Sequence, residues 1–408
     1  MPEAAAEQRL VLFGAFDRFN YGDLLYPIVV KHLIGRRAGP IQIEVCSTTA
    51  SNMSGLGADP TVQLSAPVLD DAASHATTVL VAGGEVLSQN WFGTLLASLD
   101  SESAGELIRL QSTAGAAHAE QYAKNLLSDV RRFPWLIEPA YLPANWKVAY
   151  NSVGGWPLGM ARATAQRDSA RVLEQAAFLS VRDGRTWEIL KTIWPSLPVR
   201  LAPDIISLVA RVWPKKELDM PLGLPDLAPI LSGRYICVQA NAGYLLPNLQ
   251  GFAQQISSLA AYLDAGIVLV PFGRCRGWND IDGLVVLQER LGSRAVLLGA
   301  DSSIRDVTAV AAGAALFVGT SLHGVVVSAA YGVPAVALAT PDPKVQNYLR
   351  TWPVAGSVCV SVEELSDAAR AAIREQDERM LVQVEMERMA LENFHDFSDQ
   401  LKSKSRGY

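Results

Sequence analysis

Four segments of the sequence place glycine and polar side chains directly after an expected buried strand, where ligands bind in parallel α/β sheets. The first segment, residues 14–23, ends with Asn20, Gly22 and Asp23 before an expected helix. Glycine lets the backbone approach a ligand closely, and the N-terminus of the helix favours an anion. The alternative is an ordinary turn in which Asn20 or Asp23 caps the helix. The segment is not a GxGxxG motif and gives little support for dinucleotide binding.

The second and third segments add a carboxylate and a guanidinium. Gly83 and Gly84 follow an expected strand at 78–81 and precede Glu85. Their amides could bind an oxyanion and Glu85 could act as a base, although close packing of a helix against the strand explains the glycines equally well. Arg182 follows an expected strand at 178–181, where a guanidinium suits bidentate capture of a carboxylate or phosphate. The alternative for Arg182 is a surface pair with Asp183, in which Asp183 also caps the helix that follows.

The fourth segment, residues 319–324, carries a single histidine. His323 opens an expected helix between Ser321 and Leu322 on one side and Gly324 on the other. A lone histidine is usually structural, but an imidazole at this position could donate or shuttle a proton. The glycines and hydroxyls around His323 favour the functional interpretation.

The elements that must position these residues are short apolar strands that alternate with helices. This alternation predicts parallel sheets covered by helices on both faces, which is an α/β fold of two Rossmann-like, doubly wound domains facing a cleft. The expected strands are 10–13, 41–46, 78–81, 148–152, 178–181, 199–201, 234–240, 266–272, 295–298, 315–319 and 335–339. The expected helices are 22–36, 161–176, 186–193, 247–264, 280–291, 303–312 and 323–331.

The same pattern suggests how the chain divides. We expect an N-terminal domain over residues 1–210, with a helical insertion at about 91–146 that is rich in aromatic residues. Residues 211–232 have the composition of a linker, and residues 233–375 would form the C-terminal domain. Residues 376–408 would form a C-terminal helix and tail.

Composition excludes several classes of protein. Of the 408 residues, 50% are hydrophobic and 19% are charged, so the chain as a whole is not disordered. The 35 basic and 41 acidic residues give a net charge of −6, which argues against a nucleic-acid binder with a broad basic face. The four cysteines and five histidines show no metal-binding spacing, so we expect no metal site and reduced, cytoplasmic thiols. No stretch reads as a signal peptide or a membrane span.

Taken together, the segments resemble the polysaccharide pyruvyl transferase family. The resemblance spans about residues 11–350 and rests on an ordered set of short motifs rather than on any one of them. The matching residues are Asn20-Tyr21-Gly22-Asp23, Gly83-Gly84, Ser180-Val181-Arg182-Asp183, Pro203-Asp204, Leu322-His323-Gly324, Gly332-Val333-Pro334-Ala335-Val336-Ala337 and Lys344.

The resemblance implies a GT-B-like fold and transfer of an enolpyruvyl-derived group from phosphoenolpyruvate to a saccharide, usually as a pyruvate ketal. It assigns donor contacts to Arg182 and His323. The reaction needs a proton donor (His323), a carboxylate base (Asp23 or Glu85) and a cationic clamp (Arg182 with Lys344 or Arg274). Phosphoenolpyruvate would be a substrate, and no cofactor is required.

Three residues depart from the family pattern. Ser321 stands where the family often has arginine, which puts part of the donor phosphate site in question. Leu24 and Glu85 replace a frequent glutamate and a frequent third glycine, with no consequence that can be argued physically. The substrate-binding set expected from the motifs comprises Asn20, Gly22, Gly83, Gly84, Ser321, Leu322, Gly324, Arg274 and Lys344.

The acceptor is expected to bind on the N-terminal side, where an exposed aromatic ring could stack on a sugar. Trp91 is the expected ring because it follows Gly83-Gly84-Glu85 so closely. If the acceptor is lipid-linked, the protein would work at the inner face of the membrane as a peripheral protein. Two other functions remain open: a GT-B glycosyltransferase that uses a nucleotide-sugar, with Asp342 near the ribose, and a non-catalytic saccharide-binding or assembly protein.

Overall fold

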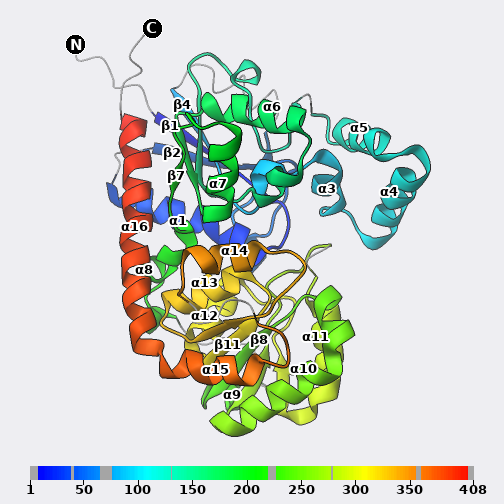
Figure 1. Cartoon of the computed structure of the whole chain (residues 1–408), viewed down its shortest axis with the longest axis vertical. Helices are drawn as coiled ribbons and strands as arrows, with labels where there is room; N and C mark the ends of the chain where they lie inside the picture. Colours follow the sequence, from blue (N-terminus) through cyan, green and yellow to red (C-terminus); the bar gives the residue numbers. More distant parts are fainter. Residues whose placement is uncertain are drawn as a thin grey trace.

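The structure, a computed structural model, describes residues 8–37, 41–64, 76–129, 131–218, 227–276, 279–354 and 360–402. It contains two parallel sheets, each packed between helices, as the sequence predicts (Figure 1). Residues 219–226 of the predicted linker lie outside the described residues. Cys359 and the C-terminal tail at residues 403–408 also lie outside them.

The first sheet has seven strands in the order β3-β2-β1-β4-β5-β6-β7. They are β1 (Gln8–Phe13), β2 (Ile41–Ser47), β3 (Val62–Gln63), β4 (Thr77–Val81), β5 (Lys147–Val153), β6 (Phe178–Val181) and β7 (Arg200–Leu201). Helices α1 (Tyr21–Arg37), α6 (Ala163–Glu174) and α7 (Gly184–Ile193) follow its strands. Alternate residues of β1 enter different cores: Leu10 and Leu12 join one cluster, and Val11 and Phe13 join another. The sheet is therefore covered on both faces.

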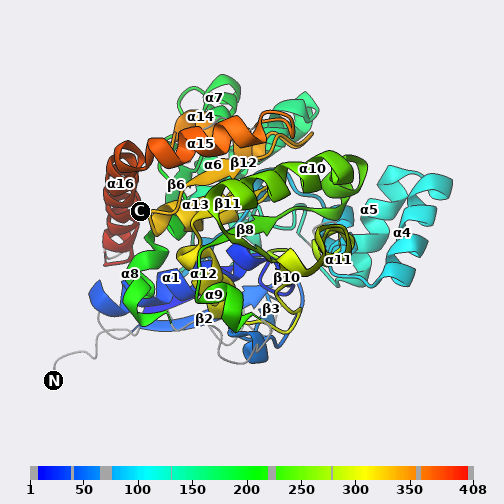
Figure 2. The same ribbon diagram turned by 90° about the horizontal axis from the view of Figure 1, so that it is seen from below.

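The second sheet has five strands in the order β10-β9-β8-β11-β12. They are β8 (Tyr235–Gln239), β9 (Gly266–Leu269), β10 (Ala295–Leu297), β11 (Leu316–Gly319) and β12 (Ala335–Ala337). Helices α10 (Ala242–Leu263), α11 (Ile281–Leu291) and α15 (Leu365–Arg374) cover one face, while α12 (Ile304–Gly313) and α13 (Leu322–Ala330) cover the other (Figure 2). Helix α14 (Lys344–Thr351) follows β12 and contacts α7 of the first half.

The shorter helices connect these layers. They are α8 (Val209–Val212) and α9 (Ala228–Leu231), with the 3₁₀ turns η1 (Ser54–Leu56), η2 (Val86–Ser88), η3 (Pro139–Tyr141), η4 (Trp156–Met160), η5 (Ile205–Leu208), η6 (Lys215–Glu217) and η7 (Gly292–Arg294). Among the described residues, no helix is both long enough and apolar enough to cross a membrane.

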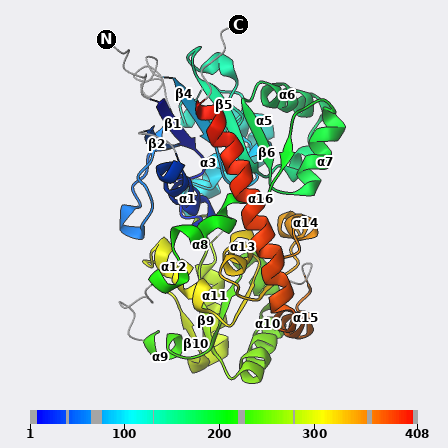
Figure 3. The same cartoon turned by 90° about the vertical axis from the view of Figure 1, so that its left-hand side faces the viewer.

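One hydrophobic core joins the two halves. The cluster that contains Leu10 and Phe178 of the first sheet also contains Tyr235 and Phe317 of the second. The last helix, α16 (Gln376–Lys402), runs along both halves and covers part of the first sheet (Figure 3). Its Phe397 packs edge-on against Phe178, with ring centroids 5.7 Å apart. The two sheets are therefore held together by shared packing as well as by the chain connection.

The insertion between β4 and β5 is helical, as expected, and projects from the body of the molecule (Figure 1). It contains α3 (Trp91–Leu96), α4 (Ser101–Ala114) and α5 (Ala116–Leu126). The prediction that Trp91 contacts the acceptor is wrong, because its side chain is only 1% exposed. The indole Nε1 donates to the Arg132 carbonyl at 3.2 Å, and the ring fills a small core with Leu95 and Leu107. A three-helix insertion has few apolar side chains, so its largest one is needed inside.

Candidate functional site

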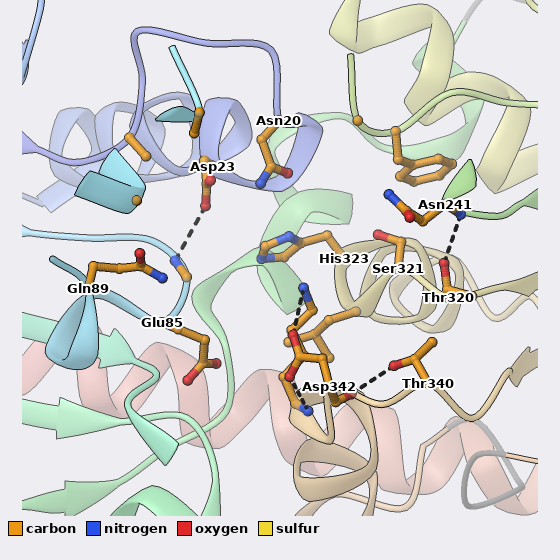
Figure 4. A pocket seen from close by; sticks show the side chains of 18 of the residues that line it. Asn20, Asp23, Glu85, Gln89, Asn241, Thr320, Ser321, His323, Thr340 and Asp342 are labelled. Carbon is orange, nitrogen blue, oxygen red and sulfur yellow. Dashed lines mark hydrogen bonds and ion pairs between the residues drawn. The ribbon is translucent and has the colours of Figure 1, made fainter. Parts of the chain in front are cut away.

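A cavity of about 530 Å³ lies between the two halves and is lined by residues that follow strands of both sheets. Asn20, Asp23 and Glu85 come from the first sheet, and Ser321 and His323 from the second; their side chains face one another across the cavity (Figure 4). This is the edge where the carboxyl ends of parallel strands place ligands in doubly wound folds. The volume lies in the range of small-molecule binding sites.

Arg182 lines this cavity, and its guanidinium bridges two carboxylates. Its Nη2 donates to Glu85 Oε1 at 2.8 Å, and its Nη1 donates to Asp204 Oδ2 at 3.1 Å. Trp352 Nε1 donates to the Arg182 carbonyl at 2.7 Å, which ties the end of β6 to the second half. The arginine is 3% exposed, so it is not a surface residue, whereas Asp183 caps α7 by accepting from Thr186 N. The expected capping role of Asp183 is therefore correct, but the expected surface pair between Arg182 and Asp183 is not.

Burial and charge act against each other in this group. Burial alone would lower the pKa of Arg182, but the charges of Glu85 and Asp204 outweigh it and raise the pKa. Burial alone would also raise the pKa of Asp204, yet the neighbouring His323 and Arg182 lower it to about 2. For Glu85, burial dominates over the attraction of Arg182, and the pKa of the carboxyl is raised. Asp204 is therefore the firmly ionised acid of the pair, and Glu85 takes up a proton more readily.

His323 connects this charge network to the second sheet. It is the second residue of α13, and its Nε2 lies 3.6 Å from Asp204 Oδ2, an ion-pair distance. Its side chain is 12% exposed and lines the cavity. A Cβ on Gly22 would lie 1.8 Å from the imidazole Nδ1, so only glycine lets the first turn of α1 pass this close. Gly22 thus makes room for His323 and does not itself line the cavity.

Asp23 and the glycine pair meet on the opposite wall. Asp23 Oδ1 accepts from Gly84 N at 3.3 Å, and both residues line the cavity. Gly83 has a φ of +95°, a left-handed conformation that glycine adopts without strain, and it does not line the cavity. Asn20 lines the cavity and forms an antiparallel bridge with Gly273 of the second half. The loop after β1 therefore links the two sheets at the site.

In the second half, the buried side-chain amide of Gln239 forms part of the cavity wall. Gln239, at the end of β8, accepts from Thr320 N at 2.9 Å and from Ser321 N at 2.8 Å. The hydroxyl of Ser321 accepts from Gly324 N and so caps α13, while Ser321 and Leu322 both line the cavity. Gly324 does not; a Cβ there would lie 2.3 Å from the Phe317 ring, so the glycine allows α13 to pack on β11.

Asp280 holds the loop after β9. Its Oδ2 accepts from Phe272 N and Gly273 N, both at 2.9 Å. The carboxyl lines the cavity, and its burial raises its pKa to about 6. The Asp280 carboxyl therefore becomes ionised at about pH 6. The loop that it holds contacts the first half through the bridge between Gly273 and Asn20.

Trp156 and Asp342 form a hydrogen-bonded pair in the wall of the cavity. Trp156, at the start of η4, donates from Nε1 to Asp342 Oδ1 at 3.2 Å, although the two come from different sheets. Lys344 Nζ lies 3.5 Å from Asp342 Oδ2. All three line the cavity, so an aromatic side chain and an ammonium group lie at the same wall.

The prediction that Arg274 contributes a cation to the site is wrong. Its Nη1 donates to the carbonyls of Ala300 and Ser302 at 2.6 and 2.7 Å, and its guanidinium lies over the Phe19 ring. It does not line the cavity. Arg274 instead joins the loop after β9 to the backbone of residues 300–302 in the second half.

The site also contains residues to which sequence reasoning assigned no role. Asp204 was noted only as part of a motif, and its position after the two-residue strand β7 gave no sign of its partners. Trp156 and Asp280 carried no signal beyond lying after expected strands, and Arg18 lay unremarked in the first segment. Among the described residues, no group of three or more His, Cys, Asp or Glu side chains could hold a metal ion.

Replacing Arg182 tests the charge network. Because Arg182→Met leaves Glu85 and Asp204 buried without a cation, we expect the free energy of unfolding to fall by about 3–5 kcal/mol in urea titrations. The control is Arg185→Met, an exposed residue paired with Glu188 on α7, which should change stability by less than about 0.5 kcal/mol. Equal effects of the two substitutions would contradict the network.

The pKa of Asp280 predicts a pH dependence. The folded-state pKa of about 6 lies above the ordinary value of 3.8, so the unfolded chain loses this proton first as pH rises. The contribution of Asp280 to stability is therefore complete below about pH 4 and lost by about pH 6. Asp280→Asn should remove this decline in urea titrations between pH 4 and 7. A decline of unchanged size would show that Asp280 is not its source.

Comparison with known proteins was made on sequence and on structure. The family model for polysaccharide pyruvyl transferase matches residues 132–343, more than half of the chain, a region that includes Arg182, Asp204 and His323. No match was found among curated protein sequences.

Among solved structures, a protein described as a UDP-N-acetylglucosamine 2-epimerase from Listeria monocytogenes has 12% identity and a TM-score of 0.56, with 99% of each chain covered. The UDP-GlcNAc 2-epimerase from Neisseria meningitidis, solved with UDP-GlcNAc, has 12% identity and a TM-score of 0.54, covering 97% of this chain and 100% of its own. At this identity the likeness concerns the fold, which is the GT-B arrangement expected from the sequence. The family match confirms the resemblance in sequence: the chain belongs to the polysaccharide pyruvyl transferase family and is a transferase.

Proposed function

We propose that the protein transfers an enolpyruvyl-derived group from phosphoenolpyruvate to a saccharide, forming a pyruvate ketal and releasing phosphate. The observation that carries this proposal is the meeting of Arg182, Asp204 and His323 at a cavity built by both sheets. Family membership supports a saccharide acceptor. The donor is the one that the resemblance to this family implies, and the charged groups in the cavity are compatible with it.

The reaction requires protonation of carbon, and we assign this step to His323. A proton from the imidazole adds to the methylene carbon of the donor, which makes the neighbouring carbon electrophilic. A sugar hydroxyl adds there and gives up its proton, and the bond to the phosphate oxygen breaks. A second hydroxyl then adds to the same carbon, passes its proton to the departing phosphate and closes the ketal. The ionised Asp204 holds the imidazole and balances a positive charge on it.

Asp23 is our choice for the base that accepts the hydroxyl proton. Glu85 is constrained at both oxygens, because Oε1 accepts from Arg182 and Oε2 accepts from Trp156 N at 3.2 Å. Asp23 accepts one long hydrogen bond from Gly84 and faces the cavity opposite His323 (Figure 4). An acid and a base on opposite walls can serve the two ends of the addition.

Lys344 and Trp156 are the groups we assign to substrate binding at the side of the cavity that they close. Lys344 can offer its ammonium group to the donor's carboxylate or phosphate, while Arg182 is held by two carboxylates. Trp156 replaces Trp91 as the aromatic ring on which the acceptor sugar stacks, because it lines the cavity and Trp91 does not. A lipid-linked acceptor would bring the protein to the inner face of the membrane as a peripheral protein.

The function is tested by phosphate release from phosphoenolpyruvate with a panel of glycosides, followed by mass analysis for a product heavier by one ketal. His323→Ala should lower kcat by roughly 10²- to 10⁴-fold, and His323→Gln nearly as much, because glutamine cannot deliver the proton. The control is His118→Ala, an exposed histidine of α5, which should keep full activity. Near-normal turnover with His323→Gln would reduce the histidine to a binding role. Turnover of nucleotide-sugars without phosphoenolpyruvate would favour a glycosyltransferase instead.

The acceptor site is tested at Trp156. Trp156→Ala should raise the acceptor's KM about tenfold and leave the KM for phosphoenolpyruvate unchanged, because the stacking face is lost. Trp156→Phe keeps an aromatic face but loses the hydrogen bond to Asp342, so its acceptor KM should stay near that of the natural protein. If Phe and Ala raise the KM equally, the contact with Asp342 matters and stacking does not.

A further inference from the structure

The wall formed by the loop after β1 contains a buried arginine with an unused hydrogen-bond donor. Arg18 lines the cavity and is 9% exposed. Its Nε donates to Asp17 Oδ1 at 2.7 Å, and its Nη1 donates to the Thr94 carbonyl at 2.9 Å. Its Nη2 is buried and has no hydrogen-bond partner among the described residues. Leaving a buried donor unpaired is unfavourable, so its presence beside a cavity calls for an acceptor.

The orientation of Arg18 is fixed before any ligand arrives. Asp17, which holds its Nε, is itself held on the other oxygen: Oδ2 accepts from Thr48 Oγ1, Thr49 N and Thr49 Oγ1 at 2.8–3.1 Å. Burial alone would raise the pKa of Asp17, but Arg18 and these hydrogen bonds lower it, so the carboxylate is ionised. A guanidinium clamped at Nε and Nη1 keeps Nη2 in one place.

The other arginine of the cavity shows the contrast. Both terminal nitrogens of Arg182 donate to carboxylates, so its positive charge is already balanced within the protein. Arg18 has one carboxylate partner, and that partner's charge is shared with three donors from Thr48 and Thr49. We propose that Arg18 binds an oxyanion, a phosphate or carboxylate group, at the wall of the cavity formed with Thr94. The anion could belong to the donor or to a charged acceptor, and the proposal does not depend on the reaction catalysed.

Binding of simple anions tests this assignment without assuming catalysis. Isothermal titration of the full chain would use inorganic phosphate, phosphoenolpyruvate and glucose 1-phosphate, with glucose as the uncharged control. Arg18→Gln should weaken the binding of at least one of these anions by about 10- to 100-fold, the usual loss for a charged hydrogen bond. If only the binding of phosphoenolpyruvate is weakened, the anion belongs to the donor. If only the binding of glucose 1-phosphate is weakened, the anion belongs to the acceptor.

Arg131→Gln is a matched control. Arg131 is also buried, pairs with a neighbouring carboxylate, Asp129, and has an unpaired Nη1 among the described residues, but it does not line the cavity. It should leave all three affinities unchanged. If Arg18→Gln does not fold, Arg18→Lys serves, because its single ammonium cannot hold Asp17 and also occupy the position of Nη2. The proposal is overturned if the natural protein binds none of the anions, if the Arg18 variant keeps every affinity, or if both variants lose affinity equally.

Discussion

The guanidinium of Arg182 is buried between two carboxylates, and each of them comes from a different strand-end loop of the first sheet. A buried cation is tolerable only while both partners stay in place, so the loops after β4, β6 and β7 are fixed relative to one another. Asp204 extends the constraint to His323 of the second sheet. The groups assigned to the reaction, Arg182, Asp204 and His323, are therefore also the groups whose contacts hold the two halves in place.

Shape imposes a second constraint at the same place. Gly22 leaves just enough room for the imidazole of His323. A Cβ on Gly14 would likewise lie only 2.5 Å from the Phe16 ring and 2.8 Å from the Ala82 carbonyl oxygen. The shared core behind the cavity contains side chains from β1 and β11 alike, so the walls cannot separate without exposing apolar surface. Preorganised donors and charges are worth most in such a water-poor, rigid setting.

Much of this arrangement could be predicted because parallel strands bring their carboxyl ends to one edge. Arg182 and His323 are far apart in sequence, yet both follow strands, and this alone placed them at one cleft. Asp204 was harder to assign, because its partners are side chains on other strands that no local pattern reveals. Trp91 was misjudged because a dense set of aromatic residues looks the same in sequence whether it fills a core or faces a ligand. Arg274 was misjudged because its partners are backbone carbonyls, which have no sequence signature.

Helix α16 gives the fold an order of assembly. Its Asn393 donates to Ser180 on β6, and its Phe394 and Phe397 complete the core on one face of the first sheet. These residues are synthesised long after β7, the last strand of that sheet. On the ribosome, the N-terminal half therefore emerges with part of an apolar face uncovered, and that part stays uncovered until the C-terminal half has been made. Completion of the first sheet, and with it the cavity, must follow translation of nearly the whole described chain.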